Sequence, residues 1–230
     1  MKKPVFYTEL AYGSGLLLLA MGTALTVFGD FGISMVVAPA YILHLKLQQL
    51  WPFFTFGMAE YVLQALIVGI MLLTFPKRKW TWLLSFVTAV LYALILDGSS
   101  ALLALLPQTL TLRIMLYLLG VAMCTAGIAL LFRTYLPPAA YELLVKELAR
   151  RKGWQVHRVK TVYDCASCVL AAVLSFLLLG RLEGVGVGTA ACALGYGLLI
   201  KLWGRLLDRC WTFRDCLDLR TKFEESEERS

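Results

Sequence analysis

The feature that most limits how this 230-residue chain can fold is a series of six long apolar runs. They cover residues 7–28, 55–75, 80–106, 111–132, 161–179 and 185–207. A helix needs about 20 apolar residues to cross the hydrocarbon core of a bilayer, so each run is long enough to span a membrane. With 60% of its residues apolar and only 16% charged, the chain does not have the composition of a water-soluble domain. The sequence predicts a single integral membrane domain over residues 1–222.

Two further apolar segments, residues 33–47 and 137–148, are too short to cross a bilayer. Each opens with residues that break or cap helices: Gly32 and Ser34 in the first, Pro137 and Pro138 in the second. The predicted fold is therefore an all-α, polytopic membrane helix bundle. It has about six transmembrane helices and two short helices that are re-entrant or interfacial. The third long run contains Asp97 and Gly98, so its helix is expected to end between residue 96 and Pro107.

The distribution of positive charge predicts the topology. Cytoplasmic loops of membrane proteins carry the excess of Lys and Arg. With six crossings and a cytoplasmic N-terminus, the inner side holds all but three of the 22 basic residues, the exceptions being Lys46, Arg113 and Arg181. Both termini are then cytoplasmic, with residues 223–230 forming a flexible acidic tail. We infer that the formal charge of +7 favours contacts with anionic lipid head groups and does not indicate binding to nucleic acid.

The order of helix, short segment, helix, helix occurs twice, at about residues 7–106 and 111–207. Tyr41 and Tyr141 correspond at an offset of 100 residues, and Glu60 and Asp164 correspond at an offset of 104. Each copy has three crossings, so the two copies insert with opposite topology. Inverted repeats with short or broken helices are typical of secondary transporters, whose site lies where the copies meet. The identities are few, and shared helix composition alone is the competing explanation.

Acidic residues inside a membrane raise a functional hypothesis by default. Glu60 and Asp164 are either a pair of acids that couple a proton or cation, or helix-end carboxylates that reach water. Asp30 and Arg133 follow the first helix of each copy, where they either line a central site or cap a helix and contact head groups. The candidates for solute or ion binding are Asp30, Ser34, Tyr41, Glu60, Arg133, Tyr141 and Asp164.

Cys165 and Cys168 are three residues apart and share one helix face, as a redox enzyme requires. No further ligand stands at metal spacing beside them, so packing is the favoured interpretation and membrane thiol chemistry the alternative. The glycines around Gly186 follow a helix and not a strand, which excludes a dinucleotide loop. The sequence predicts no cofactor, no metal and no catalytic residue.

Two short motifs resemble the YczE/YyaS/YitT group of bacterial integral membrane proteins. The first helix runs into Gly29-Asp30-Phe31-Gly32-Ile33-Ser34, similar to the group's short segment with Gly-[Leu/Ile]-Ser, and Gly186-Val187-Gly188-Thr189 resembles its Gly-x-Gly-Thr. The chain departs from the group at residues 35–39, where many members have a more polar run with a tryptophan. The resemblance covers roughly residues 7–207 and implies a bacterial plasma membrane protein with this helix layout. It implies no substrate.

These observations favour a small permease in which two inverted halves enclose a polar solute. The alternative is a membrane scaffold that does not transport and binds a cytoplasmic protein or anionic lipid. Neither interpretation predicts an enzyme, and both are compatible with a homo-oligomer.

Overall fold

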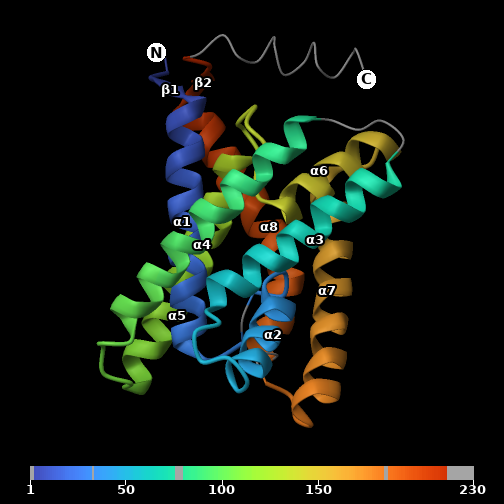
Figure 1. Ribbon diagram of the computed structural model, residues 1–230. Coiled ribbons are helices and arrows are strands. Elements are labelled where there is room, and N and C mark those ends of the chain that lie inside the picture. The colour runs from blue at the N-terminus through green and yellow to red at the C-terminus, as the bar shows by residue number, and fades with distance from the viewer. Residues whose placement is uncertain (1–2, 33, 76–79, 184–185, 217–230) are drawn as a thin grey trace.

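The structure, a computed structural model, describes residues 3–32, 34–75, 80–183 and 186–216, and it is almost entirely helical (Figure 1). This confirms the predicted all-α class. The helices are α1 (Thr8–Gly29), α2 (Ala38–Gln48), α3 (Phe56–Thr74), η1 (Trp80–Leu83), α4 (Leu84–Leu103), α5 (Leu110–Leu131), α6 (Ala140–Lys152), α7 (Val156–Leu179) and α8 (Val187–Cys210).

The start of α7 differs from the sequence-based expectation in a way that matters for the site, whereas α4 ends at Leu103, within the expected range. Helix α7 begins at Val156 and not at residue 161, which brings Lys160 into the helix. Helix α4 continues through Asp97 without a break. The Asp97 carboxylate accepts hydrogen bonds from Thr55 Oγ1 (2.7 Å) and from the backbone N–H of Gly57 (2.8 Å). Asp97 therefore caps the N-terminus of α3, where a negative charge is favourable.

Five of the described helices, α1, α3, α4, α5 and α7, are long and apolar enough to cross a membrane. Helix α8 is not among these five, although its 24 residues span about 36 Å. Large apolar side chains cover the outer surface of the bundle. Leu66, Ile70 and Leu73 of α3, for example, are 59%, 53% and 82% exposed. A surface with this much exposed hydrocarbon is suited to lipid and not to water.

Helices α1 and α5 make the most extensive contact of the bundle, at the left in Figure 1, and the remaining contacts occur in matching pairs. Helix α4 packs on α1, and α8 packs on α5. Helix α3 contacts α4, and α7 contacts α8. The two short helices both bridge the halves, because α2 and α6 each contact α3 and α7. In Figure 1, α2 lies toward the lower end of the bundle and α6 toward the upper end.

The α1–α5 contact depends on glycines spaced seven residues apart, Gly15, Gly22 and Gly29 on α1 and Gly120 and Gly127 on α5. A Cβ atom added at Gly22 would lie 2.8 Å from the Gly120 carbonyl oxygen, and one at Gly127 would lie 2.6 Å from that of Gly15. The two backbones are thus too close for any side chain. Small residues allow this approach in membranes, where van der Waals packing replaces the hydrophobic effect between helices.

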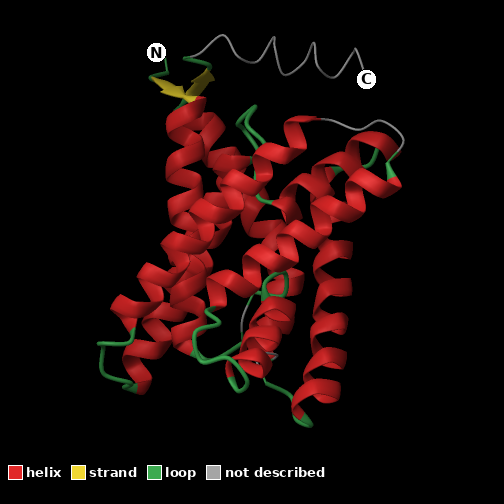
Figure 2. Ribbon diagram, viewed as in Figure 1, coloured by secondary structure: helices red, strands yellow, loops and turns green. Residues whose placement is uncertain are grey.

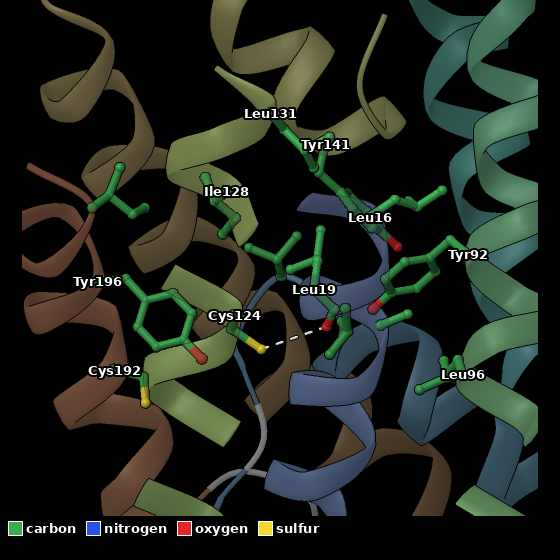
Figure 3. Close-up of a cluster of buried hydrophobic side chains, with 14 of the residues drawn as sticks. Leu16, Leu19, Tyr92, Leu96, Cys124, Ile128, Leu131, Tyr141, Cys192 and Tyr196 are labelled. Atoms are coloured by element: carbon green, nitrogen blue, oxygen red, sulfur yellow. Dashed lines mark hydrogen bonds between the residues drawn. The ribbon is translucent and has the colours of Figure 1, made fainter. Parts of the chain in front are cut away.

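Apolar side chains flank this glycine seam and form the largest buried cluster, shown in Figure 3. Leu16 and Leu19 of α1 pack beside Ile128 of α5 within it. The Cys124 thiol points at the Leu19 carbonyl oxygen, at 3.7 Å. Tyr92 enters the cluster from α4.

The two ends of the described chain lie together. The three-residue strand β1 (Val5–Tyr7) pairs in parallel with β2 (Thr212–Arg214), which follows α8 (Figure 2). Around this pair Lys3 donates to the Asp208 backbone carbonyl (2.7 Å). The predicted acidic tail, residues 223–230, lies outside the described residues.

Candidate functional site

A small polar cavity of about 20 Å³ lies between the two halves of the bundle. This volume is about that needed for one water molecule. The segment just before α2 and the first turn of α6 both line the cavity, so the two short helices begin at the same place in the core. The polar side chains in its wall are Thr23, Ser34, Gln64, Tyr92, Tyr141, Glu142 and Lys160.

Glu60 of α3 lies beside this cavity and is completely buried, at 0% exposure. Its Oε2 atom accepts hydrogen bonds from the Tyr141 hydroxyl (3.0 Å) and from Gln64 Nε2 (3.4 Å). The Gln64 side chain also accepts from the backbone N–H of Ala140 at 3.3 Å, so it caps the N-terminus of α6. Two residues one turn apart on α3 therefore hold the start of α6 in place.

On the opposite helix, α7, Lys160 and Asp164 form a buried ion pair. Lys160 Nζ donates to Asp164 Oδ1 at 2.7 Å, and the two side chains are 1% and 0% exposed. Their spacing of four residues places them on one helix face. The charges of Lys160 and Asp164 both act on the carboxyl group of Glu142, so the ion pair interacts electrostatically with the first turn of α6.

Three buried carboxyl groups, those of Glu60, Glu142 and Asp164, thus lie near the cavity, and the Lys160 ammonium group is bonded to one of them. Each of the three has one oxygen without a hydrogen-bond partner among the described residues: Glu60 Oε1, Glu142 Oε2 and Asp164 Oδ2. A buried polar atom in this state costs about 1–3 kcal/mol. Because ionised carboxylates in an apolar interior need compensating charge, the cluster favours uptake of a proton.

The structure brings four of the seven sequence-predicted candidates to this region. Ser34 and Tyr141 line the cavity, Glu60 is bonded to Tyr141, and Asp164 is bonded to Lys160 in the cavity wall. Glu60 and Asp164 come from the two halves of the chain, on α3 and α7. Their functional roles stay predictions.

The other three candidates lie elsewhere. The Asp30 side chain is 82% exposed and pairs with Arg113 at 2.9 Å. Arg133 lies at the end of the bundle where β1 and β2 pair. Its guanidinium group donates to both carboxylate oxygens of Asp208, at 2.7 and 2.8 Å. The Tyr41 ring packs edge-on against an aromatic ring of α3, with 5.4 Å between centroids, and does not line the cavity.

Sequence reasoning missed Gln64, Glu142 and Lys160. Two of them carried a usable signal, because Gln64 is four residues after Glu60 and Lys160 is four residues before Asp164. That spacing places each pair on one helix face. Glu142 had no such signal, since an acidic residue in the first turn of a helix is ordinarily read as a complement to the helix dipole.

The two family-like motifs lie against one another. The backbone N–H of Gly188, at the start of α8, donates to the Phe31 carbonyl at 2.9 Å. Gly32 adopts φ +118°, and a Cβ atom there would lie 2.5 Å from the Thr189 nitrogen. Only glycine fits this backbone conformation at such a contact. The motifs therefore fix where the chain turns from α1 toward α2. Ile33, which belongs to the first motif, lies outside the described residues.

The described residues include no group of three or more His, Cys, Asp and Glu placed to hold a metal ion. All six cysteines are free thiols, Cys165 and Cys168 included.

The apolar helices and the polar cluster in their core define a polytopic, helical integral membrane protein. The chain belongs to the DUF6198 family, a family of unknown function, which it matches over residues 6–205. It is 25% identical over 201 residues to the "Uncharacterized membrane protein YczE" of Bacillus subtilis (strain 168), covering 87% of each chain. These matches confirm the resemblance found in the sequence. No solved structure matches the chain.

Proposed function

We propose that the chain is a small permease built from two inverted repeats, with Glu60 and Asp164 as its ion-coupling acids. The observation that carries the proposal is the cavity that both short helices and the buried acid cluster share. A buried cluster with more acid than base is costly in a purely structural protein, whereas a proton-coupled transporter needs such a cluster.

The pattern of helix contacts supports the repeat. If α1, α2, α3 and α4 are exchanged with α5, α6, α7 and α8, each major contact becomes another observed contact. The α1–α4 pair becomes α5–α8, α3–α4 becomes α7–α8, and α2–α7 becomes α6–α3. Glu60 and Asp164 occupy corresponding helices under this exchange.

The paired termini support six crossings. Strand β1 precedes α1, β2 follows α8, and the two strands pair with each other. An odd number of crossings would place them on opposite faces of the membrane. We therefore take α8 as the sixth crossing and α2 and α6 as re-entrant helices. The segment just before α2 and the first turn of α6 line a buried cavity, and non-helical backbone at membrane depth must be covered by protein.

The cavity volume of about 20 Å³ is far below the roughly 300 Å³ of a typical ligand pocket. Under the proposal, this conformation is a closed state that holds a proton, a small cation or a water molecule. Transport of a larger solute then requires α2 and α6 to separate, since the segment that leads into α2 and the first turn of α6 both form part of the cavity wall.

The test is coupled uptake by the full chain in proteoliposomes that contain a pH-sensitive dye. Inorganic phosphate, succinate, glutamate and choline are added outside in turn, and proton entry is recorded. We expect one of them to drive proton entry, and Glu60→Gln to abolish it while keeping the hydrogen bond from Tyr141. Asp164→Asn is combined with Lys160→Gln, because the single change leaves a buried ammonium group uncompensated.

The matched control is Glu183→Gln, an acidic side chain between α7 and α8 that pairs with its neighbour Arg181. It removes one carboxylate without touching the cavity, so uptake should be unchanged. A chain that moves none of the four solutes contradicts the proposal. So does a Glu60→Gln variant that couples as well as the control.

A further inference from the structure

A second, larger cavity of about 320 Å³ lies between α5, α7 and α8, toward the end of the bundle where β1 and β2 pair. We call it the vestibule. Its charged and polar lining consists of Arg133, His157, Lys160, Lys201, Arg205 and Asp208. A volume of this size accommodates a small metabolite.

The vestibule is strongly basic. It has four basic side chains against one acid, and that acid, Asp208, already receives two hydrogen bonds from Arg133. Lys201 and Arg205 are exposed and have no hydrogen bond or ion pair to any other described residue. They are four residues apart on α8, where like charges repel on one helix face. An anion between them removes that repulsion.

Two glycines let α8 lie close to Arg133 and to α7 at the wall of the vestibule. Gly204 has no side chain, and a Cβ atom there would lie 3.0 Å from the Arg133 guanidinium, which donates to the Gly204 carbonyl at 2.6 Å. Gly197, seven residues earlier, faces α7, and a Cβ atom there would lie 2.9 Å from Thr161 Oγ1. Both glycines line the vestibule.

Lys160 connects the vestibule to the core. It is in the wall of the vestibule and also in the wall of the small polar cavity, and it is 1% exposed. Its ammonium group is bonded to Asp164. Lys160, bonded to Asp164, is therefore part of the partition between the open basic cavity and the small closed cavity.

We propose that the vestibule is a binding site for an anionic group, a phosphate or carboxylate, with Lys201 and Arg205 as its outer ligands and Lys160 at its inner end. This inference rests on the proposed function and deepens it, because it makes the transported solute an anion. An anion that reaches Lys160 competes with Asp164 for the ammonium group and so opens the partition. Arg133 is bonded to Asp208, so it forms a fixed part of the vestibule wall and is not an anion ligand.

The experiment is calorimetric titration of the full chain in phosphatidylcholine nanodiscs with inorganic phosphate and with succinate. We expect binding that weakens as salt is added, because the cations are exposed. The double variant Lys201→Gln, Arg205→Gln should raise Kd at least tenfold. The control, Arg209→Gln, removes an equally exposed cation from the same helix outside the vestibule and should change Kd less than twofold.

A phospholipid head group carries the same chemistry, so a second arm measures retention of phosphatidylglycerol by native mass spectrometry. Retention that depends on Lys201 and Arg205, without binding of free anions, assigns the site to lipid. Absence of both kinds of binding overturns the inference, and so does binding that the double variant leaves intact. Anion binding without any coupled uptake supports an anion site in the vestibule and contradicts the proposed permease. Uptake of choline without anion binding supports the permease and contradicts the anion site.

Discussion

The glycine seam between α1 and α5 gives the sharpest test of the fold, through Gly22→Ala. A Cβ atom at position 22 would lie 2.8 Å from both the Cys124 nitrogen and the Gly120 carbonyl oxygen. Carbon contacts are optimal at about 3.5–4.0 Å, so the helices must separate by roughly 1 Å. Two of the three opposing atoms are backbone and the third is Cys124 Sγ, so rotation of a side chain cannot relieve the contact. Overpacking costs about 1–3 kcal/mol, and we expect a value near the upper end.

The control is Gly13→Ala on the same helix, where nothing lies within 4 Å of the added Cβ atom. Thermal unfolding in detergent, followed by tryptophan fluorescence, should show Gly13→Ala at or slightly above the parent midpoint, since alanine favours helix. Gly22→Ala should lower the midpoint by about 5–10 °C, from about 2–4 °C per kcal/mol for a chain of this size. Equal midpoints for the two variants would refute the close packing of α1 on α5.

Three further predictions concern single side chains. Gly32→Ala should destabilise the protein by about 1–3 kcal/mol, because φ is +118° and Thr189 leaves no space; an unchanged midpoint would contradict the turn described here. Tyr141→Phe removes the hydroxyl that donates to Glu60 and should cost about 1–3 kcal/mol. A double-mutant cycle with Glu60→Leu, which removes the acceptor, checks this, and purely additive effects would rule out the hydrogen bond. Asp30→Asn should change stability by less than about 1 kcal/mol, since its carboxylate is 82% exposed; a larger loss in the same melting assay would give Asp30 a role that its position does not suggest.

The sequence by itself determined the class of the protein and the positions of most helices. Runs of about 20 apolar residues have few alternatives to spanning a membrane, because backbone polar groups in hydrocarbon must be bonded internally. Residues 33–47 and 137–148 were identified as short helices by length alone, and α2 and α6 occupy most of these ranges. Glu60 and Asp164 were found because an acid within an apolar run is visible without any knowledge of its neighbours.

Only the tertiary structure decided which polar residues meet. Lys160 and Glu142 look like loop and helix-end charges in the sequence, and both are buried because α6 packs against α7. Asp30 and Arg133 occupy corresponding positions in the two halves but pair with Arg113 and Asp208 from other helices. A helix of apolar residues has no sequence signal for which face meets which partner in lipid, because lipid tails and leucines are equally apolar. Close backbone contacts such as those of the glycine seam settle that choice, and they exist only once the helices are assembled.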